Sequence, residues 1–206
     1  LCNSKLLSCF VVFSLSSLEK RIMEMVLFFF IDIKDMSKIE IERKFLLKSL
    51  PIPPPTDSIK IDQFYLKNSS GIWERVRKWE GKEGIKYIHT IKKSISKIEN
   101  LEDEKDVPLD FYNKFVNKCL SGKFDSKFIN KVRHLYYDKD LIWEVDEFDN
   151  GYKLIIAEVE IPIKTFKLKI PDFIREVLLL EVSGMKQFSN RSLSLTIPKN
   201  YLVIGN

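Results

Sequence analysis

The chain has 206 residues, a length that accommodates one domain with a substantial core and leaves little room for a second large one. Apolar residues make up 45% and charged residues 31%, which excludes a disordered chain and, over most of its length, a membrane-embedded one. The 34 basic and 29 acidic residues nearly balance, so the net charge of +5 is a weak pointer to an anionic partner.

The cysteine content excludes two common kinds of small stabilised domain. Cys2, Cys9 and Cys119 are odd in number and none forms a CxxC pair, so the chain predicts neither a disulfide framework nor a zinc site. This usage favours a reducing, cytoplasmic location.

The first 35 residues differ in character from the rest. Their apolar runs, 6–18 and 26–33, are both shorter than the about 20 residues that span a bilayer, and no small-residue cleavage site marks a secretory signal. Met36 then opens the phrase MSKIEIERKFLL. We therefore expect residues 1–35 to be a lead segment outside the fold, and residues 36–206 to form one domain with no membrane association.

From Lys38 onward, apolar and polar residues mostly alternate, which predicts β-strands. Proline-rich 51–55 and turn signals at 68–71, 81–84 and 150–151 separate these segments as hairpin connections would. Many short strands in one domain favour a closed or nearly closed antiparallel barrel. The predicted strands are KIEIERKF, IDQFYLK, WERVRKW, YIHTIKK, NKVRHLYYD, LIWEVDEF, LIIAEVEIP and SLSLTIP.

Two segments read as helices. LDFYNKFVNKCL, residues 109–120, has apolar residues at helical spacing, with Asp110 near its start and Gly122 after its end. It predicts an amphipathic helix packed on the outside of the barrel. A second short helix is expected within 171–179. The predicted fold class is thus α+β, mainly antiparallel β.

Charged residues of one sign recur two positions apart, and side chains with that spacing share one face of a strand. A single pair is typical of a solvated sheet face. Several such pairs on separate strands would instead converge inside a barrel whose apolar residues face outward toward the helices. The sets are Glu40 and Glu42 with Lys44, Arg75 and Arg77, Lys131 and Arg133, Glu144 and Asp146, and Glu158 and Glu160, with Thr90 and Lys92 as a further pair.

Such an interior suits a polyanion together with its cations. Magnesium-type ions prefer carboxylate oxygens and usually keep waters and substrate phosphate oxygens as further ligands. Arginine offers a fork that matches phosphate, and lysine serves as a point charge. The candidate metal ligands are Glu40, Glu42, Asp146, Glu158 and Glu160, and the candidate phosphate-binding residues are Lys44, Arg75, Arg77, Lys92, Lys131 and Arg133.

The ordered set of motifs resembles a known family from end to end. IEIERKF looks like the ExExK signature of the CYTH superfamily, the triphosphate tunnel metalloenzymes, and it is followed in order by QFYL, RxR, TxK, KxR, WEVDEF, AEVEI and FSNRSLS. The resemblance covers about 38–198. It implies an eight-stranded antiparallel barrel that encloses a triphosphate tunnel, with helices packed outside. It also implies metal binding by the acidic motifs and phosphate binding by the basic ones.

The resemblance extends to further positions. Lys186 stands where the family often has a late basic residue that reaches the phosphates, and Tyr65 where several members have a tyrosine near the reacting end. Glu102 and Glu104 fall in an acidic stretch, LEDEKD, that allows several registers. His89 and His134 read as ordinary strand residues, and Trp73, Trp79 and Trp143 as packing residues.

The sequence therefore predicts a magnesium- or manganese-dependent hydrolase of a small triphosphate. Inorganic triphosphate is the leading substrate, with thiamine triphosphate and nucleoside triphosphates as other candidates. Lys44 and Tyr65 are the expected catalytic residues. The alternatives are a class IV adenylyl cyclase that makes cyclic AMP from ATP, and a non-catalytic module that binds polyphosphate or a triphosphate. Nucleic acid is not an expected partner, because no aromatic platform is interleaved with a basic stripe. The sequence leaves the oligomeric state open.

Overall fold

The computed structural model describes residues 38–149 and 153–195. The expected lead segment, 1–35, and the turn at 150–151 lie outside these residues. None of the helices in the described part of the chain is long and apolar enough to cross a membrane.

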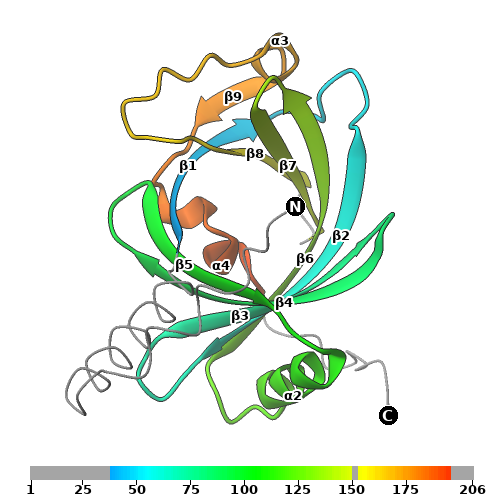
Figure 1. The fold of residues 1–206 in the computed structure, drawn as a ribbon, viewed down its shortest axis with the longest axis vertical. Helices are drawn as coiled ribbons and strands as arrows, with labels where there is room; N and C mark the ends of the chain where they lie inside the picture. The colour runs from blue at the N-terminus through cyan, green and yellow to red at the C-terminus, as the bar shows by residue number, and fades with distance from the viewer. Residues whose placement is uncertain (1–37, 150–152, 196–206) are drawn as a thin grey trace, which may run out of the picture. The chain divides into compact units, whose positions relative to one another are not determined.

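Eight antiparallel strands form a closed barrel (Figure 1). They follow the order β5-β4-β3-β2-β6-β7-β8-β1, and β1 pairs with β5 to close the ring through Lys38–Ile41 and Glu99–Glu102. The eight-stranded antiparallel barrel expected from the resemblance is confirmed. The strands are β1 (Lys38–Leu47), β2 (Asp57–Lys67), β3 (Trp73–Gly81), β4 (Gly84–Ser94), β5 (Glu99–Asp106), β6 (Ser126–Asp138), β7 (Leu141–Asp149) and β8 (Lys153–Glu160).

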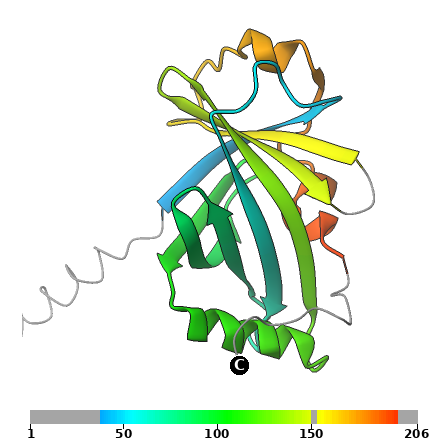
Figure 2. The ribbon, with the colours of Figure 1, turned by 90° about the vertical axis from the view of Figure 1, so that its right-hand side faces the viewer.

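The outer face of the barrel is apolar, and one side of it is covered by α2 (Leu109–Leu120). Phe115, Val116 and Cys119 of this helix pack on Phe64 and Val76 from β2 and β3. The helix has the bounds predicted from its apolar spacing. Figure 2 shows it lying across the strands on the side away from α3 and β9.

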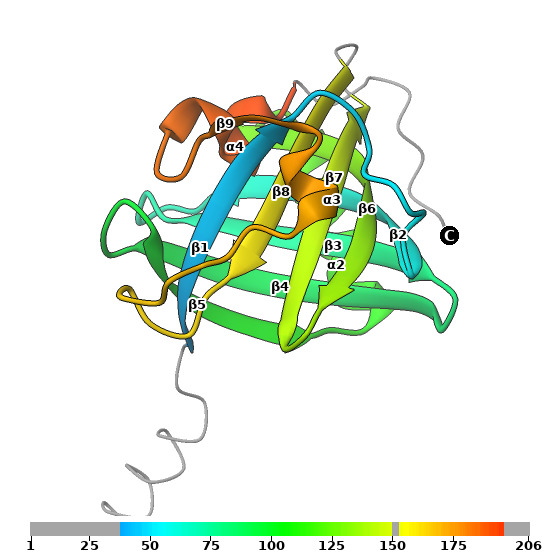
Figure 3. The same ribbon diagram turned by 90° about the horizontal axis from the view of Figure 1, so that it is seen from above.

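A second apolar layer covers the opposite side of the barrel. Short helix α3 (Asp172–Arg175) and strand β9 (Leu178–Glu181) follow β8, and β9 pairs with β1. Ile174 and Val177 pack on Phe45 and Trp143 from the barrel wall. Figure 3 shows β1, β8 and β7 side by side beneath this layer. The helix expected within 171–179 is thus present but shorter, because the chain returns to a strand at Leu178.

One predicted strand is wrong, and one strand of the barrel was missed. SLSLTIP is not a strand in its described part, because Asn190–Leu193 forms the short helix α4 and Leu195 makes one isolated bridge to Phe128. The eighth strand of the barrel is instead β5, whose sequence ENLEDEKD carries almost no apolar signal. The alternation of apolar and polar residues does not reveal this strand, because one of its faces meets charged residues in the barrel and the other meets solvent.

One end of the barrel interior is apolar. Tyr65, Ile129, Phe148 and Ile156 point inward from four strands and form a cluster with Phe188 and Leu193 beside it. Phe188 belongs to the 3-10 helix η2 (Lys186–Phe188) and Leu193 to α4. This packing leaves the charged residues of the interior to face the remaining space.

Candidate active site

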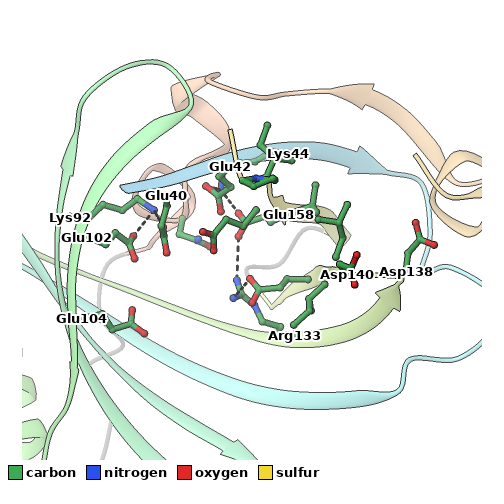
Figure 4. A pocket seen from close by; sticks show the side chains of 18 of the residues that line it. Glu40, Glu42, Lys44, Lys92, Glu102, Glu104, Arg133, Asp138, Asp140 and Glu158 are labelled. Carbon is green, nitrogen blue, oxygen red and sulfur yellow. Dashed lines mark hydrogen bonds and ion pairs between the residues drawn. The ribbon is translucent and has the colours of Figure 1, made fainter. Parts of the chain in front are cut away.

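The barrel encloses a cavity of about 840 Å³. All eight barrel strands contribute to the site, because their inward positions alternate with the outward apolar ones. Figure 4 shows the side chains of this cavity converging from several strands. Its charged lining comprises Glu40, Glu42, Lys44, Arg75, Arg77, Lys92, Glu102, Glu104, Lys131, Arg133, Glu144, Glu158 and Glu160, with Asp138, Lys139, Asp140, Lys167 and Lys169 farther along the wall.

On the β1–β8 wall, Lys44 lies between two carboxylates. Its Nζ is 2.9 Å from Glu42 Oε2 and also donates to Glu158 Oε1. The strand register places Lys44 opposite Glu158 and Glu42 opposite Glu160. Burial alone would lower the pKa of Lys44, but Glu158 and Glu42 raise it above its ordinary value. Lys44 is therefore a firmly held cation.

On the β6–β7 wall, Asp146 binds both basic residues of the KxR motif. Its carboxylate accepts from Arg133 Nε at 2.8 Å and from Lys131 Nζ. Burial and the neighbouring Arg133 lower the pKa of Lys131 to about 8. Asp146 is fully buried and does not line the cavity, so it lies behind these bases and apart from Glu40 and Glu42.

Arg133 also reaches across to β8. Its Nη2 lies 3.2 Å from Glu158 Oε2, and its Nη1 pairs with Glu144. Burial opposes ionisation of Glu158, but Lys44, Lys131 and Arg133 hold its pKa well below the ordinary value. Glu158 thus joins the two walls as a carboxylate shared between bases (Figure 4).

The β3–β5 wall pairs two arginines with two glutamates, which settles the register of LEDEKD. Arg75 Nη2 lies 3.3 Å from Glu102 Oε2, and Arg77 Nη2 pairs with Glu104. Glu104 also accepts from Thr90 Oγ1 at 3.0 Å. Glu102 and Glu104 point inward, so the alternate residues of β5 face out.

Lys92 connects this wall to β1. Its Nζ is 2.5 Å from Glu102 Oε1 and 3.2 Å from Glu40 Oε2. Burial opposes ionisation of Glu102, but Arg75 and Lys92 lower its pKa to about 2. Burial raises the pKa of Glu40 to about 7, with Lys92 acting in the opposite direction. The two carboxylates on one lysine therefore differ sharply in acidity.

Two buried donors of the cavity-lining arginines have no partner within the described residues. These are Arg75 Nε and Arg77 Nε. A buried donor without an acceptor costs about 1–3 kcal/mol, so such groups need an explanation. Guanidinium forks matched to phosphate provide one.

The acidic residues fit a hard divalent cation in donor chemistry. Glu40, Glu42, Glu158 and Glu160 all line the cavity. Burial raises the pKa of Glu42, and the negative charge of Glu158 adds to the shift. A cation would relieve this crowding of carboxylates. Across residues 38–149 and 153–195, however, no group of three or more acidic, histidine or cysteine side chains is arranged to hold a metal ion.

The two remaining predicted site residues lie in different surroundings. Tyr65 is buried at the apolar end of the interior, and its hydroxyl accepts from Gln63 Nε2 at 2.6 Å. Burial raises its pKa, so the phenol is neutral. Lys186 is exposed on η2 and is not among the described residues that line the cavity.

Some cavity residues were not predicted from the sequence. Gln63 and Asn190 are uncharged, and Asn190 accepts from Lys131 Nζ at 3.1 Å. Glu144 was identified as one of a pair but not as a site residue. Trp79, expected to pack in the core, lines the cavity, whereas Trp143 is in the outer core as expected. Trp79 lies two residues after Arg77 on the same strand, and this spacing was the available signal that its side chain points inward.

Comparisons with known proteins agree with this geometry. The chain is 28% identical over 163 residues to an inorganic triphosphatase of Acetivibrio thermocellus, which covers 79% of this chain and 97% of that protein. The crystal structure of the inorganic triphosphatase NE1496 superposes with a TM-score of 0.50 and 23% identity, over 77% of this chain and 99% of that one. A structure of the hypothetical protein NE1496 gives 0.49 and 22% over the same shares. At 23% identity, the inorganic triphosphatase structure establishes the fold alone. No protein-family model matches the chain.

Proposed function

We propose that the chain is a member of the CYTH superfamily, the triphosphate tunnel metalloenzymes, and that it hydrolyses a small triphosphate inside its barrel. One observation carries the proposal: the inward bases of four strands, Lys44, Arg75, Arg77, Lys92, Lys131 and Arg133, all pair with carboxylates of the same interior. Phosphate oxygens can replace those carboxylates as hydrogen-bond acceptors for arginine and lysine, because both anions accept charge-assisted hydrogen bonds. Carboxylates released in this way become available to a cation.

Inorganic triphosphate is the substrate we propose. The cavity residues contributed by β1, β3, β4, β5, β6 and β8 are mostly charged, which suits a substrate made of phosphate alone. The relative from Acetivibrio thermocellus is named as an inorganic triphosphatase, which supports the same choice. Thiamine triphosphate and nucleoside triphosphates remain comparison substrates for the assay.

The proposed mechanism divides the work between the two kinds of charge. Lys44, Arg75, Arg77, Lys92, Lys131 and Arg133 bind the phosphate chain and neutralise charge that develops as a bridging P–O bond breaks. Water supplies the new P–O bond, and orthophosphate and pyrophosphate are the products. Catalysis of this kind consists mainly of positioning and electrostatic stabilisation.

The cofactor we propose is magnesium or manganese, held by Glu40, Glu42, Glu158 and Glu160. Such an ion would supply charge neutralisation and an activated water. Asp146 was predicted as a further ligand, and its contacts with Lys131 and Arg133 support a role in positioning these bases. We propose that the neutral Tyr65 hydroxyl donates a hydrogen bond near the inner end of the substrate, and that Lys186 contributes only if η2 moves.

The first experiment is an assay of phosphate release from inorganic triphosphate, with ATP and thiamine triphosphate in parallel. We expect release that requires magnesium or manganese and stops with a chelator. Glu158→Gln should abolish turnover, whereas Glu147→Gln, an exposed carboxylate on the outer face of β7, should not. Cyclic AMP with pyrophosphate from ATP would indicate a cyclase. Tight binding of triphosphate without any product would indicate a binding module.

A further inference from the structure

Trp79 is the one tryptophan of the described residues that lines the cavity. It lies two positions after Arg77 on β3 and therefore faces inward from the same side of the strand. Ile61 of β2 and Lys86 of β4 are its neighbours in the sheet. Ile61 is buried, but the other inward residues of β3 that line the cavity, Arg75 and Arg77, are charged, so an indole in line with them calls for an explanation.

The guanidinium of Arg77 lies over the ring of Trp79. Arg77 Cζ lies 5.1 Å from the ring centroid, within the distance at which a cation is attracted to the face of an indole. This attraction is stronger where water is excluded, and Arg77 is only 6% exposed. The ring beneath Arg77 Cζ therefore adds a contact to the hydrogen bonds at the edge of the guanidinium.

The remaining contacts of Arg77 restrain one nitrogen, Nη2, of its guanidinium group. Its Nη2 pairs with Glu104 and lies 3.4 Å from Thr90 Oγ1, while its Nε has no partner within the described residues. Arg75 on the same face repels it. Two restraints therefore oppose that repulsion, the Glu104 carboxylate at the edge and the Trp79 ring beneath the plane.

The polar atom of Trp79 does not hold the ring in place. Its Nε1 is buried and has no hydrogen-bond partner among the described residues. The ring is consequently not oriented by its own polar group. Its position beside the cavity is explained by the cation that it carries.

We propose that Trp79 is a positioning residue that presents the Arg77 fork to the phosphate chain. The inference rests on the proposed function, because it assumes that the cavity binds phosphate. When phosphate oxygens displace Glu104 from Arg77, the edge restraint is lost and the stack on Trp79 remains. The ring then keeps the guanidinium plane aligned with the substrate, which a lysine or an unstacked arginine would not achieve.

The test is a double-mutant cycle between Trp79 and Arg77. Trp79→Leu should lower kcat/KM for inorganic triphosphate about tenfold, and Trp79→Phe, which keeps a ring, should recover most of the loss. In an Arg77→Gln background the Trp79→Leu change should have no further effect, because there is no cation left to hold. Equal losses in both backgrounds, or no loss in the wild-type background, would overturn the proposal.

Controls separate this role from simple folding. Trp143→Phe removes another buried indole N–H that has no partner, but in the outer core, and should leave kcat/KM unchanged whatever its effect on the melting temperature. If Trp79→Leu does not fold, the cycle is run with Trp79→Met, which also removes the ring, and Arg77→Gln. Full additivity of the two changes would count against the proposal.

The same cycle can be measured as binding of inorganic triphosphate by calorimetry in chelator. If the effects of the Trp79 and Arg77 changes on binding are nonadditive but the wild type shows no turnover, the role of Trp79 is retained and the proposed hydrolysis is refuted. If the two effects are additive and the wild type turns over normally, the role of Trp79 is refuted and the proposed hydrolysis is retained.

Discussion

Adjacent residues of β5 have opposite surroundings. Glu102 is 4% exposed and contacts Arg75 and Lys92, whereas Asp103, the next residue, is exposed. The two acids have similar chemistry and differ in the face of the strand that they occupy. They form a matched pair for testing whether the interior charge set, and not charge in general, determines ligand affinity.

Glu102→Gln should lower the free energy of unfolding of the ligand-free protein and raise its affinity for an anion. Losing the carboxylate leaves two partly buried bases less compensated, at a cost of about 2 kcal/mol in the free energy of unfolding. The same bases then bind imidotriphosphate, a non-hydrolysable analogue, up to about tenfold more tightly. Asp103→Asn should change neither quantity. Denaturant unfolding and calorimetry measure the two effects, and looser binding by Glu102→Gln would contradict this account.

The stability that Glu102 provides should also depend on pH. Its folded pKa is about 2 against an ordinary value of 4.5, so the carboxylate stabilises the fold fully above about pH 4.5. That contribution is lost as the pH falls from about 4.5 toward 2. The difference in unfolding free energy between wild type and Glu102→Gln should therefore shrink between pH 6 and pH 3. A difference that grows in acid would have the wrong sign.

At the scale of elements, α2 is fixed to the barrel by one face. Phe115 is buried against β2 and β3, while its neighbour Lys114 is 72% exposed and pairs only with Asp110 one turn away. Phe115→Ala should lower the unfolding free energy by about 3–5 kcal/mol. Lys114→Ala should leave the unfolding midpoint unchanged. Because the helix packs outside the barrel, Phe115→Ala should retain its KM for triphosphate at temperatures where it is folded.

The sequence predicts some elements of this fold better than others, for physical reasons. Helix α2 and strands such as β1 and β7 could be recognised because an apolar face meets a core. Strand β5 could not, because neither of its faces is apolar and its charges pair with residues far away in the chain. Charged pairs were recognisable by spacing alone. The position of Asp146 behind Lys131 and Arg133, and that of Trp79 beneath Arg77, depends on which walls meet, which spacing does not encode.

At the scale of the whole molecule, the interior is a network in which acids and bases compensate one another. A triphosphate that binds the basic residues releases carboxylates from their ion pairs. A cation that binds the carboxylates likewise releases basic residues. Binding of the two should therefore be mutually reinforcing. We expect magnesium and imidotriphosphate together to raise the melting temperature by more than the sum of their separate effects, as measured by scanning calorimetry. Strict additivity would show that the two ligands bind independently.

The seam between β1 and β5 also has a consequence for how the protein folds. Four residues at the start of β1 meet a strand that follows three intervening ones, so this contact spans far more chain than the hairpins do. Pairings of long sequence separation are slow to form, and β1 also pairs with β8 and β9, which lie still farther along the chain, so we expect the ring to close late in folding. A triphosphate recognises only the closed ring. It should therefore slow unfolding and leave the rate of refolding almost unchanged.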